Sequence, residues 1–401
     1  MKLTKKLTMA AALTVSMAAL TPGAHADGHG VQGVTDTEIV VGSNQDMSGI
    51  FAAFGAPAVK AAQMVFDEVN AAGGIHGRKI RFVVEDHAYQ MPKAMSGLNK
   101  LVNSDKVFAM LLSLGTPMNI AGFKLQDAKN IPNFGPLSAA RQMIDPPSPL
   151  HFAGTAAYYD QIRLGVPKLA ADLGKGKVCT MTLPTDFGKE IVEGAKAAAE
   201  ANDNIEYVSE TTHKPDDADF VGALQKLKGD GCEIIAMALG VRQAITVSGT
   251  AKKLGMNDMA LINSSAGFHT VMAKVPGGVT EGMYAATGWT DLLSNMDKPE
   301  TQKFFKTYTE ATGEKLPGTG AVLGYSTAQQ FVKALEAAGK DLNVESFRKG
   351  VYTLDYDDPI TGTRVDYSEN DHRGADEVII AVIKDGNWQE IARIEEGAKA
   401  N

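Results

Sequence analysis

Residues 38–86 read EIVVGSNQDMSGIFAAFGAPAVKAAQMVFDEVNAAGGIHGRKIRFVVED and contain one complete strand–helix–strand unit. The first residues form an apolar, β-branched run, which is typical of a buried strand. Apolar residues then recur at helical spacing through 59–69, and Gly73 and Gly74 end the helix. Residues 79–85 return to a strand pattern. This order predicts a parallel sheet covered by helices.

The same alternation continues along the chain and then restarts. Further strands are predicted at 107–112 and 130–136, and in the second run at 177–183, 205–210, 232–239 and 259–263. Helices are predicted at 92–102 and 118–128, and in the second run at 188–201, 220–228 and 243–254. Two such runs predict an α/β protein of two doubly wound, Rossmann-like lobes. Three later helices (301–312, 326–338 and 346–350) are expected to complete the first lobe, and a β-rich stretch (360–394) the second.

The first 26 residues have the pattern of a signal peptide. Lys2, Lys5 and Lys6 form a positive region, and an uncharged, largely apolar stretch follows. Ala24-His25-Ala26 then supplies a small-x-small cleavage site. Because the apolar stretch is shorter than the ~20 residues of a spanning helix, cleavage after Ala26 is favoured over a membrane anchor. We therefore expect a mature protein that works outside the cytoplasm.

Composition narrows the possible partners. The chain of 401 residues has a net charge of −8 and no dense Lys/Arg patch, which argues against nucleic acid and anionic membranes. With two cysteines it cannot build a disulfide framework or a four-cysteine zinc site. No metal is expected, because the eight histidines show no metal-ligand spacing. No cofactor is expected either.

The sequence contains no catalytic motif in a context that would allow it to function. Residues 28–33 spell GxGxxG but precede the first strand, whereas dinucleotide binding needs these glycines at a helix N-terminus. The chain contains no P-loop, no GxSxG elbow and no HExxH motif. Since nothing nominates a nucleophile, the sequence argues against an enzyme.

Small polar turns follow the predicted strands, where open α/β sheets bind ligands. After 107–112 comes Ser113-Leu114-Gly115-Thr116-Pro117, which can offer backbone N–H groups and a helix dipole to a carboxylate. The alternative is that Ser113 and Thr116 only cap the helix. The segment 136–140 is a second such turn. Ser48 lies in a third, and Phe54 just beyond it is either a pocket wall or core.

These segments resemble the leucine/isoleucine/valine-binding protein family. The resemblance rests on EIVVGSNQDMSGIFAAFG, VNAAGGIHGRKIRFVVED, LLSLGTP, VPGGVTEGMY and YSTAQQFVKALEAAG, and it spans residues ~36 to ~395. It implies a type I periplasmic binding fold whose two lobes, joined by three crossovers, close over a ligand. The expected division is 36–154 plus 286–357 for lobe 1, and 155–285 plus 358–401 for lobe 2.

The resemblance also implies ligand-binding residues. In lobe 1 they are Ser113 with Leu114, Gly115 and Thr116 for a ligand carboxylate, then Leu137, Ser138 and Ala139, with Phe54 at the family's tyrosine position. In lobe 2 they are Tyr158, Phe187, Val241 and Ser265. For Tyr158 and Phe187, packing into the hinge is the alternative.

Ser265 stands where branched-chain amino-acid binders of this family carry a glutamate that pairs with the ligand ammonium. A buried ammonium without an anion is costly. Either another acid, Asp160 or Asp186, takes that role, or the ligand is not a zwitterion. With Phe54, Tyr158 and Phe187 the pocket would favour an aromatic or branched carboxylate.

The resemblance therefore implies a periplasmic solute-binding protein, not an enzyme and expected to be a monomer, that delivers a small carboxylate to an ABC permease. A ligand sensor feeding a signalling receptor would use the same fold, and a secreted enzyme is a weaker alternative. Cys179 and Cys232 begin strands expected to lie side by side. They are either bonded, as an oxidising compartment permits, or packed as free thiols.

Overall fold

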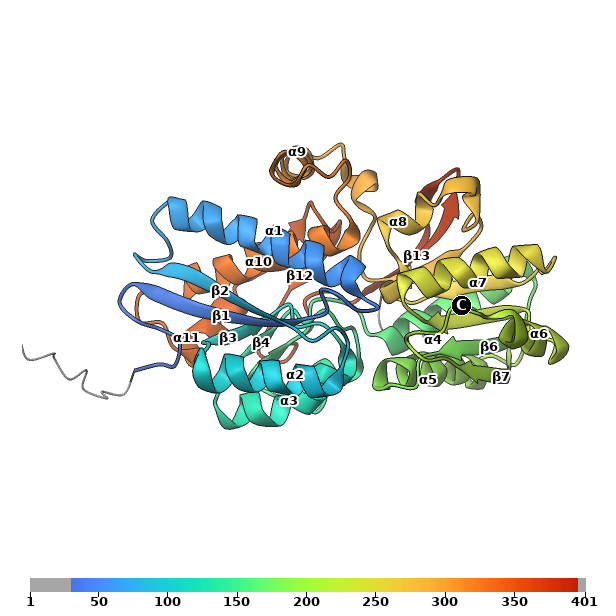
Figure 1. Ribbon diagram of the computed structural model, residues 1–401, viewed down its shortest axis with the longest axis horizontal. Coiled ribbons are helices and arrows are strands. Elements are labelled where there is room, and N and C mark those ends of the chain that lie inside the picture. The colour runs from blue at the N-terminus through green and yellow to red at the C-terminus, as the bar shows by residue number, and fades with distance from the viewer. Residues whose placement is uncertain (1–29, 396–401) are drawn as a thin grey trace, which may run out of the picture. The chain divides into compact units, whose positions relative to one another are not determined.

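A computed structural model describes residues 30–395, and the predicted signal peptide lies outside them. Residues 31–395 form two α/β lobes (Figure 1). The first lobe contains a five-stranded parallel sheet. Its strands, in spatial order, are β2 (Lys79–Asp86), β1 (Glu38–Gln45), β3 (Ala109–Leu111), β4 (Asn133–Phe134) and β5 (His151–Phe152).

Helices cover both faces of this sheet (Figure 1). One face carries α1 (Ala52–Ala71), α10 (Thr319–Ala338) and α11 (Val344–Val351), and the other carries α2 (Met91–Asn99), a π-helical turn (Lys100–Ser104) and α3 (Thr116–Ala128). Successive side chains of β1 point alternately to the two faces of the sheet. Ile39 and Val41 join the cluster under α1, whereas Val40 joins the cluster under α2. A strand buried on both faces is continuously apolar, which explains the run that the sequence shows.

The second lobe repeats the design with a seven-stranded sheet. Its order is β14 (Asn387–Glu395), β13 (Glu377–Lys384), β10 (Tyr284–Thr287), β9 (Ala260–Asn263), β8 (Ile234–Ala238), β6 (Lys177–Thr182) and β7 (Glu206–Thr212). The strands from β10 to β7 are parallel, β13 runs antiparallel to β10, and β14 runs antiparallel to β13. The helices of this lobe are α4 (Tyr158–Leu173), α5 (Asp186–Glu200), α6 (Val221–Gly229), α7 (Val241–Lys253) and α8 (Thr270–Ala273). Helix α9 (Pro299–Thr312) follows β10 in the sequence but packs into the first core through Phe304 and Tyr308.

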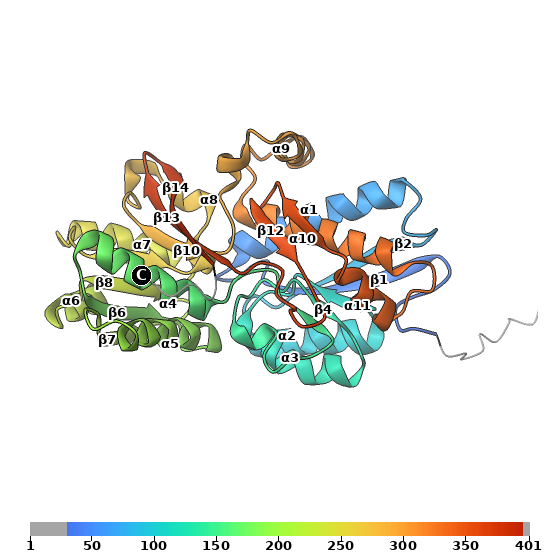
Figure 2. The ribbon, with the colours of Figure 1, turned by 180° about the vertical axis from the view of Figure 1, so that it is seen from behind.

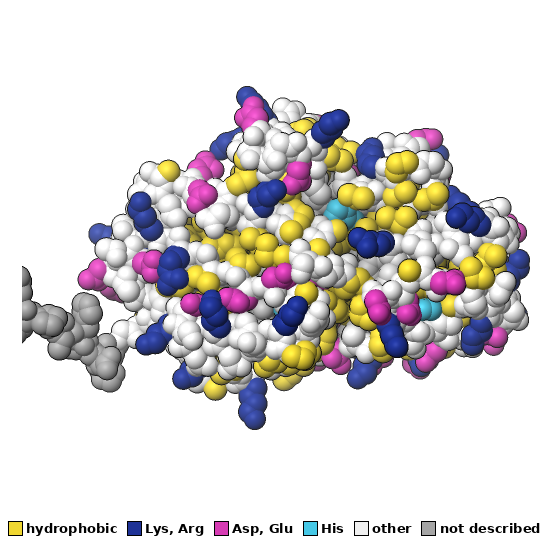
Figure 3. All heavy atoms as spheres, in the orientation of Figure 1, with side chains coloured by type: hydrophobic (Ala, Val, Ile, Leu, Met, Phe, Trp, Pro, Cys, Tyr) yellow, Lys and Arg dark blue, Asp and Glu magenta, His cyan; other side chains and the backbone are white. Residues whose placement is uncertain are grey.

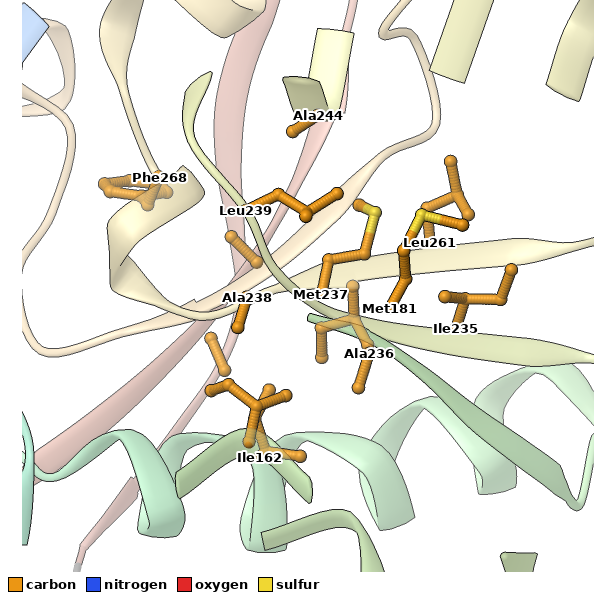
Figure 4. Close-up of a cluster of buried hydrophobic side chains, with 14 of the residues drawn as sticks. Ile162, Met181, Ile235, Ala236, Met237, Ala238, Leu239, Ala244, Leu261 and Phe268 are labelled. Carbon is orange, nitrogen blue, oxygen red and sulfur yellow. The ribbon is translucent and has the colours of Figure 1, made fainter. Parts of the chain in front are cut away.

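Strand β8 lies at the centre of the second core. Figure 4 shows its side chains Ile235 to Ala238 among their neighbours, with Ile162 of α4 on one side and Ala244 of α7 on the other. All five residues of β8 are buried. This accounts for the fully apolar pattern of the segment, because both of its faces are covered.

Cys179 and Cys232 form a disulfide in the structure, with Cα atoms 5.8 Å apart. Strands β6 and β8 are neighbours, as in the doubly wound order. Cys179 lies in β6, and Cys232 lies just before β8 rather than at its first position.

Three crossovers join the lobes: residues 153–157, 288–291 and 367–376. The first and third pair with each other, since the Ala153 N–H donates to the His372 carbonyl at 2.9 Å and the Gly374 N–H to the Ala153 carbonyl at 2.8 Å. Figure 2 shows the chain before β13 passing from one lobe to the other.

The division of the chain differs from the expected one at two places. Strand β10 belongs to the second sheet, so that lobe reaches Thr287 rather than residue 285. The hairpin of β11 (Asp355–Asp358) and β12 (Thr363–Asp366) stays with the first lobe. Val365 and Tyr367 pack into the first core, where the Tyr367 ring centroid lies 5.8 Å from that of Phe134. The β-rich stretch is thus split between the lobes, because its apolar residues serve two cores.

Candidate functional site

A pocket lies where the carboxyl ends of strands from both sheets meet. It has an empty volume of about 920 Å³, part of it open to solvent. Leu114 to Thr116 follow β3, and Leu137 to Ala139 follow β4. Ser265 follows β9 in the second lobe, and Trp289 follows β10. Open α/β sheets bind ligands at this edge, and a pocket shared by two lobes can respond to a ligand by closing.

The turn after β3 differs in detail from its expected role. Ser113 does not line the pocket, because its hydroxyl accepts from the Asn44 N–H at 3.3 Å on the neighbouring strand. Neither Ser113 nor Thr116 caps α3, whose N-cap is Gly115. Gly115 has φ +103°, a conformation that favours glycine. Thr116 does line the pocket, at the first residue of the helix.

The turns after β3 and β4 are joined by hydroxyl groups. The Thr116 and Ser138 hydroxyl oxygens lie 2.8 Å apart. The Ser138 hydroxyl also accepts from the Ala140 N–H at 3.4 Å. The Ala139 carbonyl accepts from the Tyr158 N–H at 2.7 Å, which connects this turn to the start of the second lobe. These neutral groups and the α3 N-terminus suit a carboxylate.

Aromatic rings form a continuous wall of the pocket. Ring centroids are 4.8 Å apart for Phe51 and Tyr89, 6.1 Å for Phe51 and Phe187, and 4.7 Å for Phe187 and Tyr158. Phe54 lines the pocket as well. Burial raises the pKa of Tyr89 and of Tyr158, so both phenols remain protonated and can donate hydrogen bonds. Tyr158 and Phe187 therefore contribute to the pocket and pack against each other.

Two other expected ligand residues do not line the pocket. The Ser48 hydroxyl donates to Asp86 Oδ2 at 2.7 Å and so ties the end of β1 to the end of β2. This contact helps to lower the pKa of Asp86 against the effect of its burial. Val241 begins α7 and is buried.

The pocket lining contains no Asp, Glu, Lys, Arg or His among the described residues. Asp160 is paired with Arg163 at 2.8 Å, and Asp186 lies 3.5 Å from Lys189. Neither carboxylate lines the pocket, so neither is placed to pair with a ligand ammonium in place of the glutamate that Ser265 replaces. Ser265 is 1% exposed, and its backbone N–H donates to Gln161 Oε1 at 2.8 Å.

Several lining residues escaped the sequence reasoning. Tyr89, Thr155 and Trp289 lie in loops after β2, β5 and β10. Ser326, Gln330, Thr361 and Thr363 come from α10 and the β11–β12 hairpin. Trp289 lies two residues after the end of β10, and this position close to a strand end could have indicated it. Thr361 and Thr363 had no such signal, because the sequence pattern predicted their segment as part of the second lobe.

Other kinds of site receive little support. Within residues 30–395, no group of three or more His, Cys, Asp or Glu side chains is placed to hold a metal ion. The same part of the chain contains no helix with the length and apolarity to cross a membrane. On the face shown in Figure 3, acidic and basic side chains are interspersed rather than gathered.

Comparison with known proteins gives a consistent result. A family model described as periplasmic binding protein matches residues 38–387. The fatty acid ABC transporter substrate-binding protein from Thermomonospora curvata is 26% identical, with a TM-score of 0.81, over 91% of this chain and 94% of that chain. Leu/Ile/Val-binding protein homolog 7 of Brucella abortus is 20% identical over 80% of this chain and 81% of its own length. An amino acid binding protein of Pseudomonas aeruginosa is 30% identical over 108 residues, which span 27% of this chain and 29% of that protein.

Proposed function

Because the chain belongs to the periplasmic binding protein family, and is a solute-binding protein of the ABC-transporter type, we propose that it captures a small carboxylic acid without an amino group. It would deliver this acid to an ABC permease in the inner membrane. Export with cleavage after Ala26 and action as a monomer in the periplasm are parts of the same proposal.

The observation that carries the proposal is the absence of charged side chains from the pocket lining of the described chain. An ammonium group needs an anionic partner when it is buried, and leaving it unpaired costs several kcal/mol. Ser265, which lines the pocket at the position expected to face a ligand ammonium, offers only a hydroxyl there. A fatty acid, which the similar transporter protein of Thermomonospora curvata is named for, is a carboxylate without an amino group.

The carboxylate would bind at the turns of the first lobe. Thr116 and Ser138 supply hydroxyls there, and the N-terminus of α3 supplies a favourable field for negative charge. The apolar part of the acid would lie against the wall of Phe51, Phe187 and Tyr158. Since ligand contacts come from both lobes, binding would stabilise a closed state.

Matched pairs of ligands test this proposal. Calorimetric titration would compare leucine with its deaminated analogue, and phenylalanine with phenylpropanoate. We expect the acid of each pair to bind at least as tightly as the amino acid, because the α-amino group finds no anion. Tight binding of an amino acid together with weak binding of its deaminated analogue would contradict the proposal.

The variant Ser265→Glu provides a matched control for the same titrations. A carboxylate at this position repels a bound acid and attracts an ammonium. The affinity ratio of amino acid to acid should therefore rise by about 10-fold or more. An unchanged ratio would show that residue 265 does not face the α-position of the ligand.

A further inference from the structure

Most polar side chains of the pocket already have partners within the protein. Thr116 is bonded to Ser138, Thr361 Oγ1 lies 3.0 Å from Thr363 Oγ1, and Gln330 Nε2 donates to Ser326 Oγ at 3.1 Å. All of these belong to the first lobe. Each of them has a hydrogen-bond partner before any ligand binds.

Three lining residues differ from these. Thr155 Oγ1, Ser265 Oγ and Trp289 Nε1 are buried and have no hydrogen-bond partner. Ser265 is 1% exposed and Trp289 is 6% exposed. Buried polar groups in folded proteins are nearly always paired, and an unpaired one costs about 1–3 kcal/mol. Three such groups lining one pocket point to a partner that arrives with the ligand.

The strand order and the first crossover place these three residues near one another. Strands β9 and β10 pair in parallel, and Ser265 and Trp289 follow their carboxyl ends. Thr155 lies in the first crossover against Gly288, where an added Cβ would stand 1.8 Å from Thr155 Oγ1. Gly288 thus gives the hydroxyl of Thr155 room beside Trp289. We call Thr155, Ser265 and Trp289 the donor set.

We propose that the donor set binds an uncharged oxygen of the ligand, such as a hydroxyl, distinct from its carboxylate. The inference rests on the proposed function and narrows the substrate class to oxygenated carboxylic acids. The indole N–H can only donate, so its partner must be an acceptor. The two hydroxyls can donate or accept and would complete the shell around that oxygen. A charged group is disfavoured because no counter-charge lines the pocket in the described chain.

The test places the oxygen on the α-carbon, the position that Ser265 is proposed to face, and compares 3-phenyllactate with 2-methyl-3-phenylpropanoate, in which a methyl group of similar size replaces the hydroxyl. The pair 2-hydroxyhexanoate and 2-methylhexanoate serves for an aliphatic ligand. We expect the hydroxylated member of at least one pair to bind about 10-fold tighter by calorimetry, because the other leaves the donor set unpaired. In Trp289→Phe this preference, taken as the ratio of the two affinities, should fall about three- to tenfold.

Thermal stability separates a ligand contact from a structural role. The donors are unpartnered in the free protein, so Thr155→Val and Ser265→Ala should leave its melting temperature unchanged or higher. Trp388→Phe is the matched control, because the Trp388 indole N–H donates to the His269 carbonyl at 3.0 Å. This variant should lower the melting temperature and keep the preference for the hydroxylated probe.

The outcomes are distinguishable. Equal binding of both members of each pair, or a preference that survives in Trp289→Phe, overturns the inference while the carboxylate proposal stands. If no carboxylic acid of either pair binds, both are overturned.

Discussion

At the scale of single residues, Thr116 and Ser138 come from different turns, yet their hydroxyls lie 2.8 Å apart beside the α3 N-terminus. We predict that Thr116→Val weakens binding of a carboxylic acid by about 10- to 150-fold, because a hydrogen bond to a charged group is lost. Titration calorimetry measures the change. The side chain keeps its shape, so the fold should be unaffected.

Thr180→Val is the matched control for this variant. The Thr180 hydroxyl is also paired with another hydroxyl, that of Tyr207 at 2.9 Å, and it lies in β6 away from the pocket lining. It should bind the acid as the wild type does. Equal affinities for Thr116→Val and Thr180→Val would remove the turn after β3 from the site.

At the scale of elements, the disulfide joins β6 to the segment before β8 across a sequence separation of 53 residues. Closing a loop of this length stabilises the folded state by about 4 kcal/mol in the chain-entropy model. The double variant Cys179→Ala/Cys232→Ala should lose about 2–4 kcal/mol in chemical denaturation. Its affinity for the acid should stay the same, since neither cysteine lines the pocket.

Mass spectrometry after alkylation without reductant checks the bond itself. The wild-type protein should take up no alkyl group at these positions. Two alkylated thiols would show that the cysteines are free in solution.

His269 caps the N-terminus of helix α8 and is buried in its neutral form. His269 Nδ1 accepts from the Val271 N–H at 3.0 Å, and Nε2 lies 3.2 Å from the Ala53 carbonyl, to which it donates. Burial lowers the pKa of His269 to about 4. The unfolded chain, with a pKa near 6.5, then binds more protons than the folded one between these values.

Stability should therefore fall as the pH drops from about 6.5 toward 4, by up to about 3 kcal/mol from this residue. His269→Gln can keep both hydrogen bonds without titrating, so its free energy of unfolding should depend less on pH. Denaturation curves at several pH values measure the difference. Four other histidines also have pKa values lowered by burial and should leave a remaining slope: His87, His151, His213 and His372. A variant with the same slope as the wild type would show that His269 is not the titrating group.

At the scale of the whole molecule, the ligand wall and the polar turns are divided between two lobes that three crossovers connect. A ligand that contacts both lobes favours a closed state over an open one. X-ray scattering should show a smaller radius of gyration at saturating acid than without it. The variant Thr116→Val, at a concentration of acid that leaves it unbound, should show no change. An unchanged profile of the saturated wild-type protein would contradict the closure mechanism.

The sequence by itself was sufficient for the alternation of strands and helices, the two doubly wound lobes and the family, which the family match confirms. Buried parallel strands and their covering helices have local patterns, so periodicity reveals them. Turn positions after strands also led to Thr116 and Ser138, and the family resemblance led to Ser265. All three line the pocket. Only the tertiary structure separated Thr116 from Ser113, because the direction of a side chain in a turn depends on its neighbours. It alone brought Trp289 and Thr155 beside Ser265. These residues come from separate crossovers and strand ends, and their proximity depends on strand order, which no local pattern encodes.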